Sequence, residues 1–335
     1  MKAIVYAQAG LPIDDAASLY EADAPRPTPR SRDLIVKIEA ISVNPVDTKV
    51  RASAQPPGER ILGWDAAGVV AQKGDDASLF EVGDRVWFAG DITRPGTYAE
   101  FTAVDERIVG HAPKTLSSAQ AAALPLTTIT AWELLFDRLA IPEGRGQGQT
   151  LLVVGAAGGV GSILVQLARQ LTGVTIIGTA SRAETKDWIH HLGAHHVVDH
   201  SQPLEPQLRA LGVPQVDHVI SLTHTDSHYS QLVDVLRPQG QFALIDDPVH
   251  LDPSLLKRKS ISLHWEFMFT RSMYQTPDMV KQHDLLTRVA ELIDHGTIKT
   301  TIGQHFGAIN AENIRRAHAL VESHKAVGKL VLEGF

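Results

Sequence analysis

The sequence predicts an α/β protein that combines a doubly wound parallel sheet with a mostly β domain. Three observations support this: the chain length, a change near Ser117 from short β-type runs to alternating strands and helices, and an apolar strand with a glycine-rich turn over 151–161. The 335 residues are enough for about two domains, each with its own core. With 44% hydrophobic and 21% charged residues, the composition is that of a packed globular protein.

The two ends of the chain are expected to build the mostly β domain together. Up to about Thr115, Gly, Pro and Asp separate short β-type runs, for example 34–38, 68–71 and 84–88. After Phe269 the pattern predicts a helix over 278–295, a helix from the cap Asn310 to about His324, and a final strand over 328–332. Both ends then complete one domain around an inserted fold.

The middle of the chain is expected to form the parallel sheet. Ser117 or Ser118 caps a short Ala-rich helix, and a second helix is predicted over 128–139. The first strand, 151–154, is apolar throughout, which is typical of a parallel strand buried on both faces. Further strands are predicted over 174–178, 196–198, 216–221, 241–245 and 261–267, and helices over 162–171, 184–192 and 229–236. The predicted bounds are 1–126 and 271–335 for the β domain and 127–270 for the inserted one.

Charge and cysteine content exclude several classes of function. The net charge is −7, and the 38 acidic and 31 basic residues are spread along the chain, so we expect no nucleic-acid partner. The chain has no cysteine, which removes disulfides, thiolate zinc ligands and cysteine nucleophiles. The uncharged stretch 146–168 carries six glycines and indicates a strand and a helix rather than a membrane span. The first residues lack a signal-peptide pattern, so we expect a cytoplasmic protein with no membrane association.

The strongest functional motif is the turn after the first apolar strand. Its residues are Gly155, Ala156, Ala157, Gly158, Gly159, Val160 and Gly161. Small residues there let backbone N–H groups and the helix dipole approach a pyrophosphate closely. Alanine stands at the first glycine position of the usual fingerprint, but the strand–turn–helix context predicts a Rossmann dinucleotide site in which 157–161 bind the cofactor. A tight turn without a ligand is the alternative.

The end of the second strand favours NADP(H) over NAD(H). An NAD site usually has Asp or Glu there, about 20 residues after the glycines, to bind the ribose hydroxyls. This chain has Ser181 and Arg182, followed by Lys186, which together supply a hydroxyl and two cations for a 2′-phosphate. The alternative is a solvated helix start, because Glu184 and Asp187 lie next to the cations.

Five segments carry a family resemblance that covers the whole chain. They are 42–47 (Ser-Val-Asn-Pro-Val-Asp), 63–70, 82–86, 124–128 and the glycine turn. Together they resemble the medium-chain dehydrogenases/reductases, in the quinone oxidoreductase branch. Within that branch, 265–273 and 328–335 resemble the subgroup often named zinc-type alcohol dehydrogenase-like proteins. The resemblance implies a GroES-like catalytic domain built from both chain ends and a Rossmann domain between them.

The resemblance does not extend to zinc ligands. Asn44 stands where zinc-dependent members have their first Cys ligand, and Gly63-Trp64-Asp65 stands in place of their Gly-His-Glu segment. The lobe with four cysteines for structural zinc is also missing, with 90–96 in its place. We expect surface positions, not a ligand set, for the histidines His190, His191, His195, His196 and His200. The prediction is a protein without zinc.

The resemblance also implies the catalytic residues. Asn44 would lie near the nicotinamide and offer its amide to the substrate oxygen. Asp47 would orient that neighbourhood, or alternatively cap a turn after Pro45. Lys49 stands where many members have a tyrosine; it is expected either in the cleft, stabilising an anion or donating a proton, or on the surface in water.

The same resemblance implies further cofactor contacts and a partner. Thr128 and Phe269 are expected near the nicotinamide, and Lys329 at a cofactor phosphate. Pairing of the strand over 261–267 with a second copy is the common way in which this branch dimerises, so we expect a homodimer.

These observations predict a zinc-independent oxidoreductase that transfers hydride from NADPH to a small quinone or an α,β-unsaturated carbonyl. Such acceptors are already electrophilic, so hydrogen-bond donors and a proton source are sufficient for their reduction. Two alternatives stay open: a zinc-dependent alcohol dehydrogenase with a histidine-built site, and a protein that binds NADPH without turnover.

Overall fold

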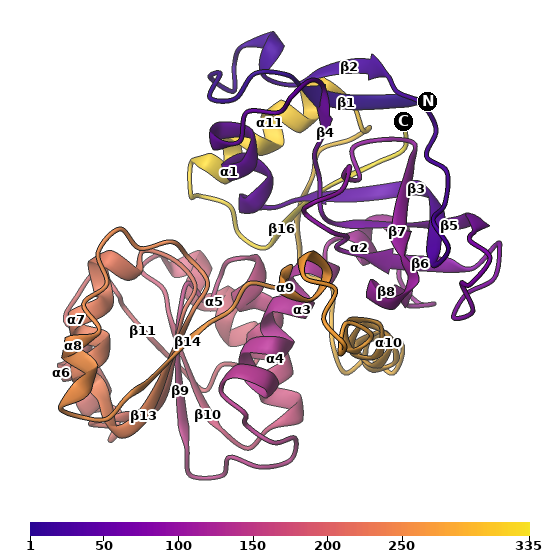
Figure 1. Ribbon diagram of the computed structural model, residues 1–335. Coiled ribbons are helices and arrows are strands. Elements are labelled where there is room, and N and C mark those ends of the chain that lie inside the picture. The colour runs from indigo at the N-terminus through magenta and orange to yellow at the C-terminus, as the bar shows by residue number, and fades with distance from the viewer. The chain divides into compact units, whose positions relative to one another are not determined.

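The computed structural model describes residues 1–335, and the chain divides into two units (Figure 1). Unit 1 comprises Met1–Ile129 and Phe269–Phe335, and unit 2 comprises Thr130–Met268. The predicted boundaries, after 126 and after 270, fall a few residues from these divisions.

Unit 2 contains the predicted doubly wound parallel sheet. Its strands run β11-β10-β9-β12-β13-β14, and each neighbouring pair is parallel. In Figure 1, α4 and α5 lie on one face of the sheet and α6, α7 and α8 on the other. The strands are β9 Thr150–Val154, β10 Thr175–Thr179, β11 His196–Val198, β12 Val216–Ser221, β13 Leu236–Leu244 and β14 Ser262–Trp265; the helices are α4 Gly159–Leu171, α5 Ala183–His191, α6 Leu204–Ala210, α7 Thr225–Val235 and α8 Ser254–Lys257.

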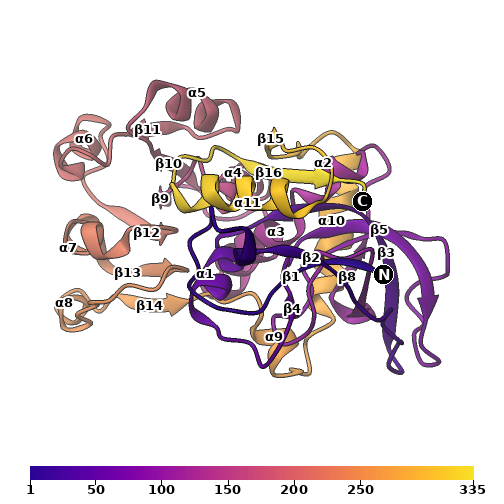
Figure 2. The same cartoon turned by 90° about the horizontal axis from the view of Figure 1, so that it is seen from above.

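Unit 1 contains a seven-stranded sheet, ordered β15-β16-β3-β5-β6-β8 with β7 paired to β3, and a three-stranded sheet, β2-β1-β4. Figure 2 shows α11 beside β16 and α1, with which it is in contact. The strands are β1 Lys2–Tyr6, β2 Tyr20–Asp23, β3 Asp33–Val43, β4 Arg60–Ile61, β5 Ala66–Lys73, β6 Arg85–Phe88, β7 Phe101–Asp105, β8 Val109–His111, β15 Ile302–His305 and β16 Lys329–Glu333. The helices are α1 Pro45–Ser53, α2 Ser118–Ala122, α9 Thr270–Met273, α10 Lys281–Asp294 and α11 Ala311–Glu322, with short 3₁₀ turns at Ala16–Ser18 and Glu106–Ile108.

Some elements differ from the prediction. The helix expected over 128–139 is α3, Pro125–Trp132, followed by a π-helical segment, Glu133–Arg138. The last strand of the parallel sheet, β14, ends at Trp265 and not at Phe267. Helices α1 and α6 were not predicted; both carry a proline in their first turn, which that position tolerates. No helix has the length and apolarity needed to cross a membrane.

Candidate active site

Three neighbouring strands of unit 1 bring three polar residues to one end of the sheet. Strand β3 ends at Val43, directly before Asn44. Its neighbours β16 and β5 run antiparallel to it, so their first residues lie at the same end. Lys329 is the first residue of β16, and Asp65 directly precedes β5. Sheet register therefore brings together residues that are far apart in the sequence.

These residues form a buried network around the carboxylate of Asp65. Asn44, Asp65 and Lys329 are only 1%, 0% and 3% exposed. The Asp65 Oδ2 accepts hydrogen bonds from Asn44 Nδ2 and from Lys329 Nζ, both at 3.1 Å. Ser42 Oγ donates to Oδ2 at 2.8 Å, and the Leu126 N–H donates to Oδ1 at 3.0 Å. Burial raises the pKa of Asp65, but the Lys329 ammonium and these donors favour the ionised form.

A second buried series of hydrogen bonds begins at Asp47, in the first turn of α1. Its Oδ2 accepts the Asn44 main-chain N–H at 2.7 Å and the Tyr98 hydroxyl at 3.0 Å. The same hydroxyl lies 3.1 Å from His318 Nε2. Burial raises the pKa of Asp47 to about 7 and lowers that of His318 to about 3. Asp47 thus both caps α1 and holds the main chain of Asn44.

The other residues predicted at the active site differ in exposure. Thr128 is fully buried, and its hydroxyl has no hydrogen-bond partner. Phe269 is buried edge-on against Trp64, with ring centroids 6.1 Å apart. Lys49 is exposed on α1. Thr128 therefore has a buried hydroxyl without a protein partner, whereas Lys49 is at the surface.

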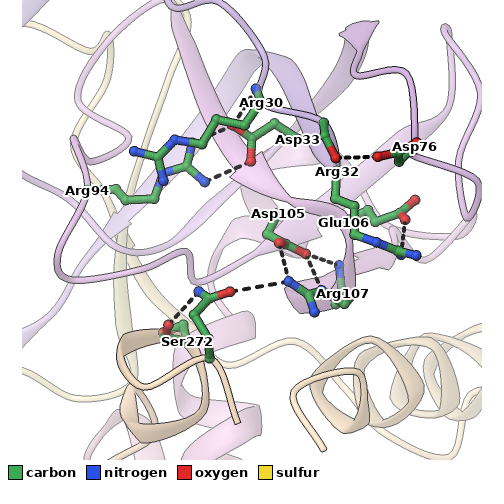
Figure 3. Close-up of polar contacts among 11 residues, drawn as sticks. Arg30, Arg32, Asp33, Asp76, Arg94, Asp105, Glu106, Arg107 and Ser272 are labelled. Carbon is green, nitrogen blue, oxygen red and sulfur yellow. Dashed lines mark hydrogen bonds and ion pairs between the residues drawn. The ribbon is translucent and has the colours of Figure 1, made fainter. Parts of the chain in front are cut away.

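A network of arginines and carboxylates lies elsewhere in unit 1 (Figure 3). Arg94 binds Asp33 through two hydrogen bonds, at 2.8 and 2.6 Å, and Arg107 binds Asp105 in the same way, at 2.9 and 2.7 Å. They line a cavity of about 430 Å³. Because Arg94 belongs to 90–96 and Asp33 is the first residue of β3, the Arg94–Asp33 pair holds this segment against β3.

In unit 2 the glycine turn joins β9 to α4, as predicted. Gly155 has a positive φ of 79°, and Gly158 is the extended residue directly before α4. A Cβ on Gly161 would lie 2.5 Å from Ala156 Cα and the Ala156 oxygen, so only glycine lets the helix pack this closely on the turn. The turn lies at the carboxyl end of β9, where the strand order reverses toward β12, which is where open parallel sheets bind ligands.

The residues predicted for a 2′-phosphate follow β10. Ser181 and Arg182 are exposed, and the Arg182 guanidinium has no hydrogen-bond or ion-pair partner. Lys186 is half-buried, with its ammonium 3.4 Å from Asp199 Oδ2. One free cation and one weakly paired cation thus lie at the start of α5.

The residues present do not fit a zinc site. No group of three or more His, Asp or Glu side chains is arranged to hold a metal ion. Among the clustered histidines, His195 contacts Arg169 and accepts the Ile176 N–H, while His200 lies 3.2 Å from Thr179 Oγ1. Asp65, in the segment that corresponds to zinc ligands, is instead surrounded by hydrogen-bond donors of the protein.

Sequence reasoning did not single out Asp65, Tyr98 or His318 as site residues. For Asp65 a signal was available, because a carboxylate within the otherwise uncharged segment 61–72 has to find partners when that segment is buried. Tyr98 and His318 are 220 residues apart and carry no local pattern.

Comparisons with known proteins identify the family. Residues 30–114 match the alcohol dehydrogenase GroES-like domain, and 192–332 match the zinc-binding dehydrogenase family. A zinc-type alcohol dehydrogenase-like protein of Staphylococcus aureus is 40% identical over 92% of both chains. The crystal structure of a Rhizobium etli CFN 42 protein, assigned as a zinc-dependent alcohol dehydrogenase, is 53% identical, with a TM-score of 0.96 over 100% of this chain and 98% of that one.

A quinone oxidoreductase and a protein solved with NADPH also match over nearly the whole chain. The rat quinone oxidoreductase is 28% identical over 93% of this chain and 92% of its own. A mycobacterial protein solved in complex with NADPH is 28% identical, with a TM-score of 0.85 over 99% of this chain and 100% of that one. With its GroES-like segment, its parallel sheet and these relatives, the chain belongs to the medium-chain dehydrogenase/reductase superfamily of oxidoreductases, among the zinc-type alcohol dehydrogenase-like proteins.

Proposed function

We propose that this protein is a zinc-independent oxidoreductase that transfers hydride from NADPH to a quinone or an α,β-unsaturated carbonyl. The observation that carries the proposal is the Asn44 network. By the family resemblance, Asn44 and the segment that contains Asp65 stand where the zinc-dependent members have metal ligands, and here the buried ammonium of Lys329 contacts both side chains. Such a site offers hydrogen bonds to an acceptor that is already electrophilic, whereas oxidation of an unactivated alcohol needs a Lewis acid.

The roles of the protein groups follow from their contacts. When bound, NADPH supplies the hydride. The Asn44 amide donates a hydrogen bond to the acceptor oxygen as negative charge develops there, and Asp47 keeps the main chain of Asn44 in place. A proton from water, aided by Lys49, completes the hydroquinone or protonates the α-carbon of the enolate.

The cofactor contacts are proposed on the same basis. Residues 157–161 present backbone N–H groups and the start of α4 to the pyrophosphate. Ser181, Arg182 and Lys186 bind the 2′-phosphate, for which the unpaired Arg182 guanidinium is the best-suited group. Thr128, with its buried unpartnered hydroxyl, and Phe269 contact the nicotinamide end.

Fluorescence titration tests the cofactor. We expect NADPH to bind at least about tenfold more tightly than NADH, because charge-assisted hydrogen bonds contribute about 1.5–3 kcal/mol each. Arg182→Ala should remove most of this preference. Arg209→Ala, which removes an exposed arginine paired with Glu205 on α6, is the matched control and should leave it unchanged. Equal affinity of the wild type for both cofactors would contradict the phosphate assignment.

Turnover and metal content test the chemistry. Steady NADPH oxidation with small quinones or enones, by protein that contains no zinc, is the expected result. Stoichiometric zinc, with activity lost to chelators, would support the zinc-dependent alcohol dehydrogenase instead. NADPH binding without oxidation by any quinone, enone or aldehyde would indicate a binding protein.

We also propose a homodimer that forms through β14. This strand is at the edge of the parallel sheet and pairs only with β13. Trp265 and Phe267 beside this edge are 51% and 47% exposed, an unusual exposure for large apolar side chains. Sedimentation should show a dimer that Trp265→Glu dissociates; a wild-type monomer would contradict the proposal.

A further inference from the structure

The Asn44 amide has one orientation that its neighbours permit. Its Oδ1 faces the Lys329 ammonium, and its Nδ2 faces the Asp65 carboxylate at 3.1 Å. An ammonium can only donate hydrogen bonds and a carboxylate can only accept them. If the amide oxygen and nitrogen exchanged places, two donors would face each other at Lys329 and two acceptors would face each other at Asp65.

The Lys329 ammonium is fully used in this arrangement. It donates to Asn44 Oδ1, to Asp65 Oδ2 at 3.1 Å and to the main-chain oxygen of Val43 at 3.3 Å. A lysine has three N–H hydrogens, so none is left for a cofactor phosphate unless one of these contacts breaks. The structure thus places Lys329 against Asn44, while the phosphate contact expected for it stays a prediction.

The amide nitrogen has one hydrogen left. Nδ2 carries two hydrogens, and Asp65 accepts one of them. The second has no acceptor in the structure. If the amide turned over, the atom offered at this position would be Oδ1, which repels a carbonyl oxygen.

We propose that Lys329 and Asp65 are positioning residues that hold the Asn44 amide with one Nδ2–H free to bind the carbonyl oxygen of the acceptor. This inference rests on the proposed function and assigns the site a carbonyl acceptor. The buried ion pair holds a fixed donor at this position, and Lys329 acts on the reaction through Asn44.

The test is a double change, Lys329→Met with Asp65→Asn, which removes both charges and leaves no carboxylate unpaired. We expect kcat with a quinone or an enone to fall about 10- to 100-fold, less than the cost of about 100- to 1000-fold for losing an oxyanion donor outright, because the Asn44 amide is still present but no longer held in place. NADPH affinity should stay within about twofold of the wild type. In an Asn44→Ala background the same double change should lower kcat no further. An equal additional loss in that background would overturn the inference, as would a loss of NADPH affinity with unchanged kcat.

A second readout does not need turnover. The side-chain amide signals of Asn44, assigned by their loss in Asn44→Ala, should show slow hydrogen exchange for the proton bound to Asp65 in the wild type and fast exchange in the double variant. Unchanged exchange would overturn the inference even in an active enzyme. Slow exchange in a protein that oxidises no NADPH would support the positioning while contradicting the proposed function.

Discussion

The polar groups of the two units differ in whether the protein already supplies their hydrogen-bond partners. In unit 1, Asn44, Asp65 and Lys329 are buried and saturate one another, leaving a single amide hydrogen. In unit 2, no side chain caps the start of α4 at the glycine turn, and the Arg182 guanidinium has no protein partner. A group already fixed by the protein can act on charge that develops during a reaction without rearranging, whereas an unpaired group gains its partner when the ligand binds. The first pattern suits chemistry, and the second suits cofactor binding.

The most direct test of this comparison is to replace one lysine in each unit. Lys329→Met leaves the Asp65 carboxylate buried without a cation, and we expect it to lower the free energy of unfolding by about 3–5 kcal/mol. Lys186→Met breaks a 3.4 Å pair whose side chains are 39% and 24% exposed, and should cost less than about 1 kcal/mol. Urea denaturation followed by circular dichroism measures both. A loss for Lys329→Met as small as that for Lys186→Met would contradict the expectation that Asp65 needs the Lys329 ammonium as its buried counter-charge.

The pH dependence of stability should also separate the units. Burial raises the pKa of Asp47 to about 7 in unit 1, and that of Glu266 to about 9 in unit 2, where the like charge of Glu133 adds to it. The folded state then binds more protons than the unfolded chain, so each group's contribution is fully present below about pH 4 and is lost as the pH rises through the folded pKa. Near pH 5–6 each group should contribute a slope of about −1.4 kcal/mol per pH unit.

Two amide variants resolve these contributions. Asp47→Asn should flatten the profile between about pH 4 and about pH 7, and Glu266→Gln should flatten it up to about pH 9. Unfolding measured in urea from pH 4 to 9 provides the profiles. A profile for Asp47→Asn that is parallel to the wild type would show that Asp47 titrates in its ordinary range.

Within unit 2, two glycines of the turn separate stability from cofactor binding. Gly161→Ala places a Cβ 2.5 Å from the backbone of Ala156 and should cost about 1–3 kcal/mol of stability together with NADPH affinity. Gly158→Ala meets only the Gly155 oxygen, at 3.4 Å, so stability should stay within about 0.5 kcal/mol. Its methyl group nevertheless lies at the start of α4, and NADPH should bind more weakly. Unchanged NADPH affinity in Gly158→Ala would contradict pyrophosphate binding at this turn.

The same contrast explains what sequence could predict. The glycine turn is a local pattern between a strand and a helix, so its place in the fold followed from a few consecutive residues. The Asn44 network joins residues 21 and 285 positions apart, which only the pairing of β16, β3 and β5 brings together. Asn44 and Asp47 were singled out through their family motif, but the hydrogen bonds that hold them depend on sheet register. The sequence alone could therefore predict the glycine turn of unit 2, but it could not predict the hydrogen bonds of the Asn44 network in unit 1.

The smallest expected effect concerns Lys49, which is near Asn44 in sequence but exposed on α1. Water screens an exposed ammonium, so Lys49→Ala should lower kcat less than about tenfold. Asn44→Ala should lower it about 100- to 1000-fold, the usual cost of losing an oxyanion donor. Lys37→Ala, which removes another exposed lysine, from β3, is the control and should leave kcat unchanged. If Lys49→Ala instead lost as much activity as Asn44→Ala, an exposed side chain would supply the proton, and burial would no longer distinguish the groups that perform the chemistry.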